Sequence, residues 1–221
     1  MKQRIYALSI MLAILFSFSN TLLVAQTGDD PNLDRIPDDF LHHQANRAPL
    51  PSTVVTIDGY DNYYLGIDFA EGHISEDPQA PGDYFVAFNI DETYYTNNGH
   101  DWFGSNVSWG GYSIRGDVLT AYDGDGVLYY ENMYGASIQG CVLVRSTDNG
   151  QTWSTPVVAI AGNDKNWLCA DQTDGPYANY VYTTMTNNGK GNFARSTNQG
   201  LSFTSTFQPT TQSLPGMMVC V

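Results

Sequence analysis

The chain has 221 residues, of which 42% are hydrophobic and 13% aromatic, so it can bury a core and form one domain or two small ones. Its 9 basic and 23 acidic side chains give a formal net charge of −14. A surface for nucleic acid or for an anionic membrane needs clustered positive charge, so both kinds of partner are excluded. The abundant tyrosines and glycines favour strands joined by tight turns over helices.

The first 25 residues have the pattern of a secretory signal peptide. Lys2 and Arg4 precede an apolar stretch at residues 5–18, which is long enough for a signal and short for a membrane span. The small side chain of Ala25 precedes the expected cleavage point. We therefore expect a secreted or cell-surface protein that is not inserted in a membrane after cleavage; an uncleaved anchor is the alternative. Residues 26–52 read as a flexible polar leader.

A segment of eight residues then occurs three times, and each copy is called an octet below. The octets are Tyr95–Trp102, Ser146–Trp153 and Ser196–Phe203. Their glycines stand at positions 99, 150 and 200, so the repeat is about fifty residues long. Asp or Asn shortly before Gly is typical of a hairpin turn, because Gly accepts a positive φ and the Asx side chain bonds turn amides. Each octet is therefore predicted to be a turn whose final Trp or Phe begins the next strand.

The octets resemble the Asp-box, the S-x-D-x-G-x-T-W motif of the bacterial neuraminidase (BNR) repeat in the sialidase-like family. The second octet matches at every defined position, whereas the first and third carry substitutions. The resemblance covers the chain from about residue 67 onward. It implies that each repeat is one four-stranded antiparallel blade of a β-propeller, and that the octet side chains are structural rather than catalytic. The octet positions are Asn97, Gly99, Trp102, Ser146, Asp148, Gly150, Thr152, Trp153, Ser196, Asn198, Gly200 and Phe203.

Residues 53–221 are thus predicted to form an all-β propeller with about three blades and an incomplete ring. Residues 53–57 are expected to close a blade that is not present, and residues 217–221 to begin a fourth blade. The chain reads as an N-terminal fragment; a short protein that closes its ring by oligomerising is the alternative. The predicted strands are 72–75, 84–88, the run before Tyr95 and 107–109; then 118–122, 127–134, 141–145 and 153–160; then 167–170, 178–186, 192–195 and 203–207.

Two further features bear on metals and redox chemistry. The segment Asp123–Gly126 resembles half a calcium loop, but it lacks the closing Glu and is predicted to be a hairpin turn. Cys141, Cys169 and Cys220 are odd in number and lie in apolar runs, which predicts buried free thiols. Their spacing fits no zinc site, and no cofactor is expected.

Topology selects the candidate ligand-binding residues. In an antiparallel blade with strands A to D, the D–A and B–C loops share one face, and the A–B and C–D turns share the other. The resemblance implies that a ligand lies on the D–A and B–C face. Carboxylates there can act as acid, base or nucleophile, Arg can hold an acid group, and Trp can stack on a sugar. The alternative is that these residues are loop caps and solvated charges. The candidates, placed in or near D–A loops, are Glu71, His73, Arg115, Asp117, Asp164, Lys165, Asn166 and Trp167.

Sialidase chemistry finds less support in the sequence. The family carries an Arg-Ile-Pro motif and three arginines that clamp the substrate carboxylate. Arg35-Ile36-Pro37 lies in the leader, outside a strand context, and Arg145 and Arg195 precede octets. Only Arg115 falls on the ligand face. We therefore expect a secreted, non-catalytic scaffold that binds glycans or cell-surface glycoproteins; the alternative is an exported glycoside hydrolase of the sialidase-like (exo-α-sialidase) type.

Overall fold

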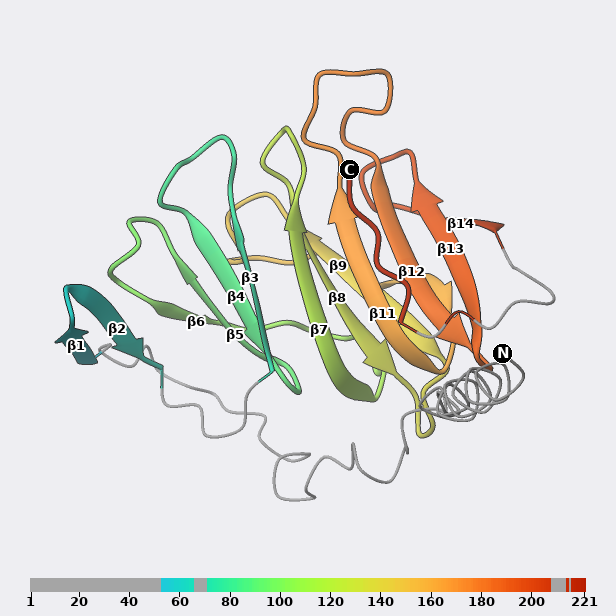
Figure 1. The fold of residues 1–221 in the computed structure, drawn as a ribbon, viewed down its shortest axis with the longest axis horizontal. Coiled ribbons are helices and arrows are strands. Elements are labelled where there is room, and N and C mark those ends of the chain that lie inside the picture. Colours follow the sequence, from blue (N-terminus) through green and yellow to red (C-terminus); the bar gives the residue numbers. More distant parts are fainter. Residues whose placement is uncertain (1–52, 66–70, 208–213, 215) are drawn as a thin grey trace, which may run out of the picture. The chain divides into compact units, whose positions relative to one another are not determined.

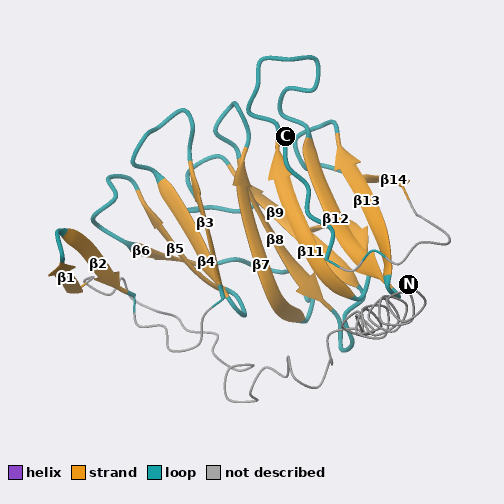
Figure 2. Cartoon of the chain, viewed as in Figure 1, coloured by secondary structure: helices purple, strands orange, loops and turns teal. Residues whose placement is uncertain are grey.

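The computed structural model describes residues 53–65, 71–207, 214 and 216–221, so the predicted signal peptide and leader lie outside the described residues. The described part is all-β, and no helix occurs in it (Figure 2). It therefore holds no helix long and apolar enough to cross a membrane.

Twelve of the strands form three four-stranded antiparallel sheets in which each strand pairs with its neighbours in sequence (Figure 1). These sheets are the blades of a β-propeller, and we call them the first, second and third blade. The first comprises β3 (Gly72–Glu76), β4 (Tyr84–Phe88), β5 (Glu92–Thr96) and β6 (Phe103–Ser105). The second comprises β7 (Ile114–Tyr122), β8 (Leu128–Tyr134), β9 (Gly140–Ser146) and β10 (Val157–Ala161). The third comprises β11 (Asp164–Ala170), β12 (Val181–Asn187), β13 (Lys190–Ser196) and β14 (Thr204–Phe207).

The core lies between successive blades, because alternate side chains of each strand face the sheet before it and the sheet after it. Phe85 of the first blade packs with Val118 and Tyr130 of the second. Tyr129 and Leu143 of the second blade pack with Leu168 and other apolar side chains of the third. Each blade thus buries its apolar surface only against its neighbours, as in other radial repeat folds.

Several strand predictions were wrong, among them the fourth strand of the second blade, which is Val157–Ala161 and not residues 153–160. The fourth strand of the first blade is Phe103–Ser105, not residues 107–109. Strands β7 and β11 begin several residues earlier than predicted, and both show register shifts near their starts. Residues 217–221 form no strand. Thr53–Ile57 (β1) does form a strand, and it pairs with Tyr60–Tyr64 (β2) in a hairpin of its own.

The second octet is a turn held by its own side chains. Ser146 Oγ accepts from the backbone N–H of Gly150 at 2.9 Å and donates to Asp148 at 2.7 Å. The same carboxylate accepts from Thr152 N at 2.8 Å and Thr152 Oγ1 at 2.6 Å. In the third octet, Ser196, Asn198 and Ser202 repeat this pattern.

The first octet begins one residue later than predicted. Thr96 Oγ1, not Tyr95, bonds the Asx side chain, and the side chain that accepts the turn amides is Asn98, not Asn97. Strand pairing agrees, since Thr96, Ser146 and Ser196 each pair with the first residue of strand B in their own blade. Asn97 instead donates to Asp83 at 2.6 Å. Phe103 therefore stands where Trp153 and Phe203 stand in the other octets.

A pair of substitutions at Asp148 tests this turn. Asp148→Asn should change the free energy of unfolding by less than about 0.5 kcal/mol, because Asn198 makes the equivalent bonds in the third octet. Asp148→Ala should cost about 1–2 kcal/mol, since the buried Ser146 hydroxyl and the Thr152 amide lose their partner. Urea denaturation at pH 7 measures both values, and equal losses for the two variants would contradict the assigned bonds.

The stability that Asp148 supplies should also depend on pH. Partial burial works to raise the pKa of Asp148, but hydrogen bonds from Thr152 and Ser146 outweigh it and hold that pKa below its ordinary value. The contribution is therefore present above the carboxyl pKa of the unfolded chain and lost as the pH falls through the lower folded value. Asp148→Asn should remove this part of the acid dependence.

The octets also join neighbouring blades. Asn149 donates to the Thr96 carbonyl of the preceding blade at 2.8 Å, and Gln199 donates to Asp123 and Asp125 at 3.2 and 3.1 Å. Trp153 Nε1 donates to Ser105 Oγ at 2.9 Å. These contacts give the octets of the second and third blades a structural role.

The turn after β7 and the burial of the three thiols are two further local predictions that the structure tests. The segment Asp123–Gly126 is the predicted hairpin turn between β7 and β8, closed by a bond from Asp123 N to Val127 O at 3.1 Å. Among the described residues, no group of three or more His, Cys, Asp or Glu could hold a metal ion. All three thiols are free, but only Cys141 is buried. The prediction of buried thiols was wrong for Cys220, which is exposed in the C-terminal segment, and Cys169 is half-buried.

Candidate functional site

Six of the predicted ligand-face residues gather where the first strands of the three blades begin. We call Glu71, His73, Asp117, Asp164, Lys165 and Trp167 the strand-A cluster. Strand β7 contacts both β3 and β11, which brings these strand starts together. Asp117, Asp164 and Lys165 lie within strands that begin earlier than predicted, not in loops as expected.

Asp117 is the central carboxylate of the cluster. It stands in a β-bulge with a φ of +50°, within the register shift between Gly116 and Leu119 of β7. Its Oδ2 lies 3.5 Å from Lys165 Nζ. Burial raises the pKa of Asp117, the Lys165 ammonium works against this rise, and the charges of Glu71 and Asp164 add to it. Asp117 is thus a carboxyl whose proton is held more tightly than usual.

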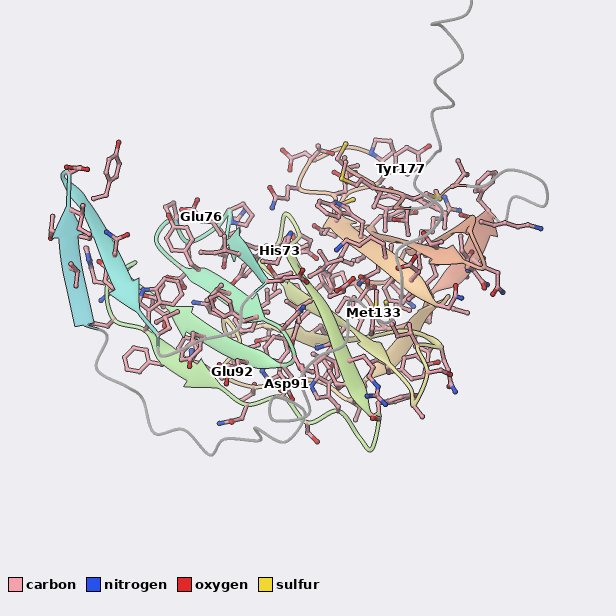
Figure 3. All side chains as sticks on the ribbon, turned by 60° about the horizontal axis from the view of Figure 1, so that its bottom comes forward. His73, Glu76, Asp91, Glu92, Met133 and Tyr177 are labelled. Carbon is pink, nitrogen blue, oxygen red and sulfur yellow. The ribbon has the colours of Figure 1, made fainter. Side chains whose placement is uncertain are left out.

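His73 lies between the first and second blades (Figure 3). Its Nδ1 accepts the backbone N–H of Thr120 at 3.2 Å and lies 3.0 Å from Thr120 Oγ1. An Nδ1 that accepts leaves the proton on Nε2. Burial, with a smaller effect of Lys165, lowers the pKa of His73 and favours the neutral ring. The ring meets the indole of Trp167 edge-on, with 6.2 Å between centroids.

The backbone around this cluster is fixed by buried amides. Asn89 Nδ2 donates to Glu71 Oε2 at 2.8 Å, and its Oδ1 accepts from Val118 N at 3.4 Å. Asn132 Oδ1 accepts from Gly116 N at 2.9 Å and so supports the bulge that carries Asp117. These two amides position Glu71 and Asp117, which belong to adjacent blades. Asn89 and Asn132 were not among the residues predicted from the sequence.

Arg115 does not point into the cluster. It lies in β7, not in the predicted loop, and its guanidinium donates to the backbone carbonyls of Gly135 and Ala136 at 2.5 and 3.0 Å. Both carbonyls belong to the loop between β8 and β9 of the same blade. The planar fork that could hold an acid group is therefore used to support that loop.

A second set of polar side chains is buried between the second and third blades. Glu131 of β8 is fully buried, and its Oε1 accepts from Asn166 Nδ2 at 3.0 Å and from Thr183 Oγ1 at 3.1 Å. Burial raises the pKa of Glu131 to about 7, although the bonds from Asn166 and Thr183 oppose the rise. Glu131 Oε2 and Asn166 Oδ1 are not bonded to a nitrogen or oxygen atom of the described residues, and the Cys141 thiol is the donor next to both side chains. The sequence signal, one Glu inside a predicted apolar strand, was missed.

The strand-A cluster therefore combines carboxylates, one ammonium, a neutral imidazole and an indole at the same end of three strands. Carboxylates accept hydrogen bonds from hydroxyls, and an indole offers an apolar face to a sugar ring. Two of these carboxyl groups could also act as acid and base in glycoside hydrolysis. The described residues do not bring an arginine clamp to this cluster, because Arg115 is turned away.

Comparisons with known proteins add the following. No protein-family model matches the chain, and no curated protein matches it. Among solved structures, a protein of unknown function from Dyadobacter fermentans is 12% identical over 68% of this chain and 58% of that chain, with a TM-score of 0.49. The α-L-arabinanase of Penicillium chrysogenum is 13% identical over 62% of this chain and 44% of that chain, with a TM-score of 0.44. The intramolecular trans-sialidase of Ruminococcus gnavus is 17% identical over 57% of this chain and 29% of that chain, with a TM-score of 0.39.

This chain thus spans less than two thirds of the length of each of these proteins. At such identities and TM-scores the comparisons assign no activity.

Proposed function

We propose that the protein is a secreted Asp-box β-propeller that binds a glycan at the strand-A cluster without cleaving it. The observation that carries this proposal is the indole of Trp167 against the His73 ring, at the same end of three strands as the Asp117–Lys165 pair. An aromatic face with a few polar groups around it is the usual composition of a sugar site. The octets would be Asp-boxes that join the blades, and residues 1–25 the signal peptide.

The charges of the cluster favour an uncharged glycan over an acidic one. Its one ammonium, on Lys165, is already paired with Asp117, while Glu71 and Asp164 add negative charge. Arg115 is engaged with two backbone carbonyls. A carboxylate ligand such as a sialic acid would meet repulsion here, whereas sugar hydroxyls would find acceptors.

A glycan array probed with the labelled protein, followed by calorimetry with the best ligand, tests the proposal. Trp167→Ala and Asp117→Asn should each weaken binding about tenfold or more, which corresponds to about 1.4 kcal/mol. Tyr177→Ala is the matched control, because Tyr177 is an exposed aromatic residue outside the cluster, and it should bind as the wild type does. If binding survives both cluster substitutions, the glycan does not bind at the strand-A cluster.

The second candidate function is glycoside hydrolysis, and the raised pKa of Asp117 favours it. A carboxyl that holds its proton more tightly than usual is suited to protonate a leaving group, and Glu71 or Asp164 would be the second carboxylate. Incubation with neutral oligosaccharides and fluorogenic sialosides decides between the candidates. Sugar release that Asp117→Asn abolishes would establish the hydrolase and overturn the non-catalytic proposal.

A further inference from the structure

The C-terminal residues lie along the face of the third blade that is turned away from the second blade (Figure 1). We call it the outer face. Leu214 N donates to Gly189 O at 2.9 Å, and Gly216 N donates to Thr186 Oγ1 at 3.0 Å. Thr184 Oγ1 in turn donates to Met217 O at 2.7 Å. As the chain advances from 214 to 217, its partners move back from 189 to 184. The segment therefore runs antiparallel to β12 and parallel to β11.

Strand alternation shows which side chains share this face. Thr186, Thr184 and Tyr182 alternate along β12 and so point to one side, while Thr183 points to the other side and bonds Glu131 of the second blade. Tyr182 pairs in register with Cys169 of β11, so the Cys169 side chain stands on the outer face as well. A segment that passes Thr184 at Met217 reaches the level of Tyr182 and Cys169 two residues later, at residue 219, directly before Cys220.

Two properties of the thiols agree with this placement. Burial raises the pKa of Cys169 to about 12, and the charge of the Cys220 thiolate adds to the rise. Cys169 is half-buried, Cys220 is exposed, and both are free thiols in this structure. Cys141 is separate: it is buried between the second and third blades, with its sulfur 3.7 Å from that of Met185.

We propose that Cys169 and Cys220 form a disulfide bond that fastens the C-terminal residues to the third blade. The oxidant is a disulfide, such as oxidised glutathione. The exposed Cys220 sulfur attacks it, which forms a mixed disulfide and releases one thiol. The Cys169 sulfur then attacks the Cys220 sulfur, which forms the intramolecular bond and releases the second thiol. In total, two protons and two electrons pass from the two cysteine thiols to the oxidant, which leaves as two thiols.

Mass spectrometry of the full chain tests this bond. The protein is incubated with oxidised glutathione, denatured without reductant, alkylated and digested. We expect a linked peptide pair containing Cys169 and Cys220, and alkylation of Cys141 alone. Cys141→Ser is the control and should keep the linked pair. In Cys169→Ser, the glutathione adduct should remain on Cys220, because no second thiol is there to displace it.

A thermal readout separates the bond from bystander oxidation. The oxidised wild-type protein should unfold several degrees above the reduced protein, and Cys169→Ser should lose this difference. The proposal is overturned if all three cysteines of the wild type are alkylated after oxidation, if a glutathione adduct persists on wild-type Cys220, or if Cys220 links two chains instead.

Discussion

Glu131→Gln is expected to stabilise the protein by about 3 kcal/mol at pH 8 and to change its stability little at pH 4.5. The buried carboxyl has a pKa of about 7 in the folded chain against 4.5 as its ordinary value, so folding disfavours its ionised form. A pKa raised on folding leaves stability intact below the unfolded value. The stability is then lost as the pH rises toward the folded value, here between about 4.5 and 7. Glutamine has the same shape and cannot ionise.

Urea denaturation of both proteins across this pH range measures the effect. The wild-type curve should fall relative to the Glu131→Gln curve from about pH 4.5 to 7 and then run parallel to it. Glu131→Ala is the control, and it should be destabilised at every pH because it leaves Asn166 and Thr183 without their acceptor. A constant difference between wild type and Glu131→Gln at all pH values would show that Glu131 does not titrate in this range.

Gly150→Ala is expected to destabilise the protein by about 3 kcal/mol or more. Gly150 has a φ of +79°, which strains any other residue, and a Cβ placed there would lie 2.6 Å from the ring of Phe85. Phe85 is fully buried in the preceding blade, so it cannot move aside without disturbing the core. The midpoint of urea unfolding, with the slope unchanged, reports this loss.

Gly111→Ala separates backbone strain from packing. Gly111 has a φ of +93°, but a Cβ there would meet no atom within 4 Å. This substitution should cost only about 1 kcal/mol, which is the strain alone. If the two variants lose the same stability, the octet glycine is not needed for contact between the blades.

The blade architecture follows from the sequence because its signals are local. Asx-Gly turns fix a hairpin wherever they occur, and a repeat of about fifty residues leaves room for four short strands. The first octet misled the prediction at Gly99, since the glycine there lies one residue earlier than in the other copies. The pairing of Thr96 with Tyr84 gives the true register, and that pairing is visible only in the folded sheet.

The candidate site was partly predictable for a related reason. Topology alone places the starts of strands β3, β7 and β11 together, and so it places Glu71, Asp117 and Lys165. Topology does not predict the direction in which a side chain points. Arg115 turns to the carbonyls of Gly135 and Ala136, and the bulge that carries Asp117 depends on a bond from a distant amide. Such long-range contacts leave no local pattern in a sequence.

The central claim is that a glycan binds at the strand-A cluster, and the indole NMR signals of the protein test it most directly. Trp102, Trp109, Trp153 and Trp167 each give one indole N–H signal, assigned by single Trp→Phe substitutions. Titration with the best array ligand should shift the Trp167 signal in proportion to saturation. The Trp153 signal, from the indole bonded to Ser105 in the octet region, should stay in place. Saturable binding that moves Trp153 and leaves Trp167 unchanged would contradict the account.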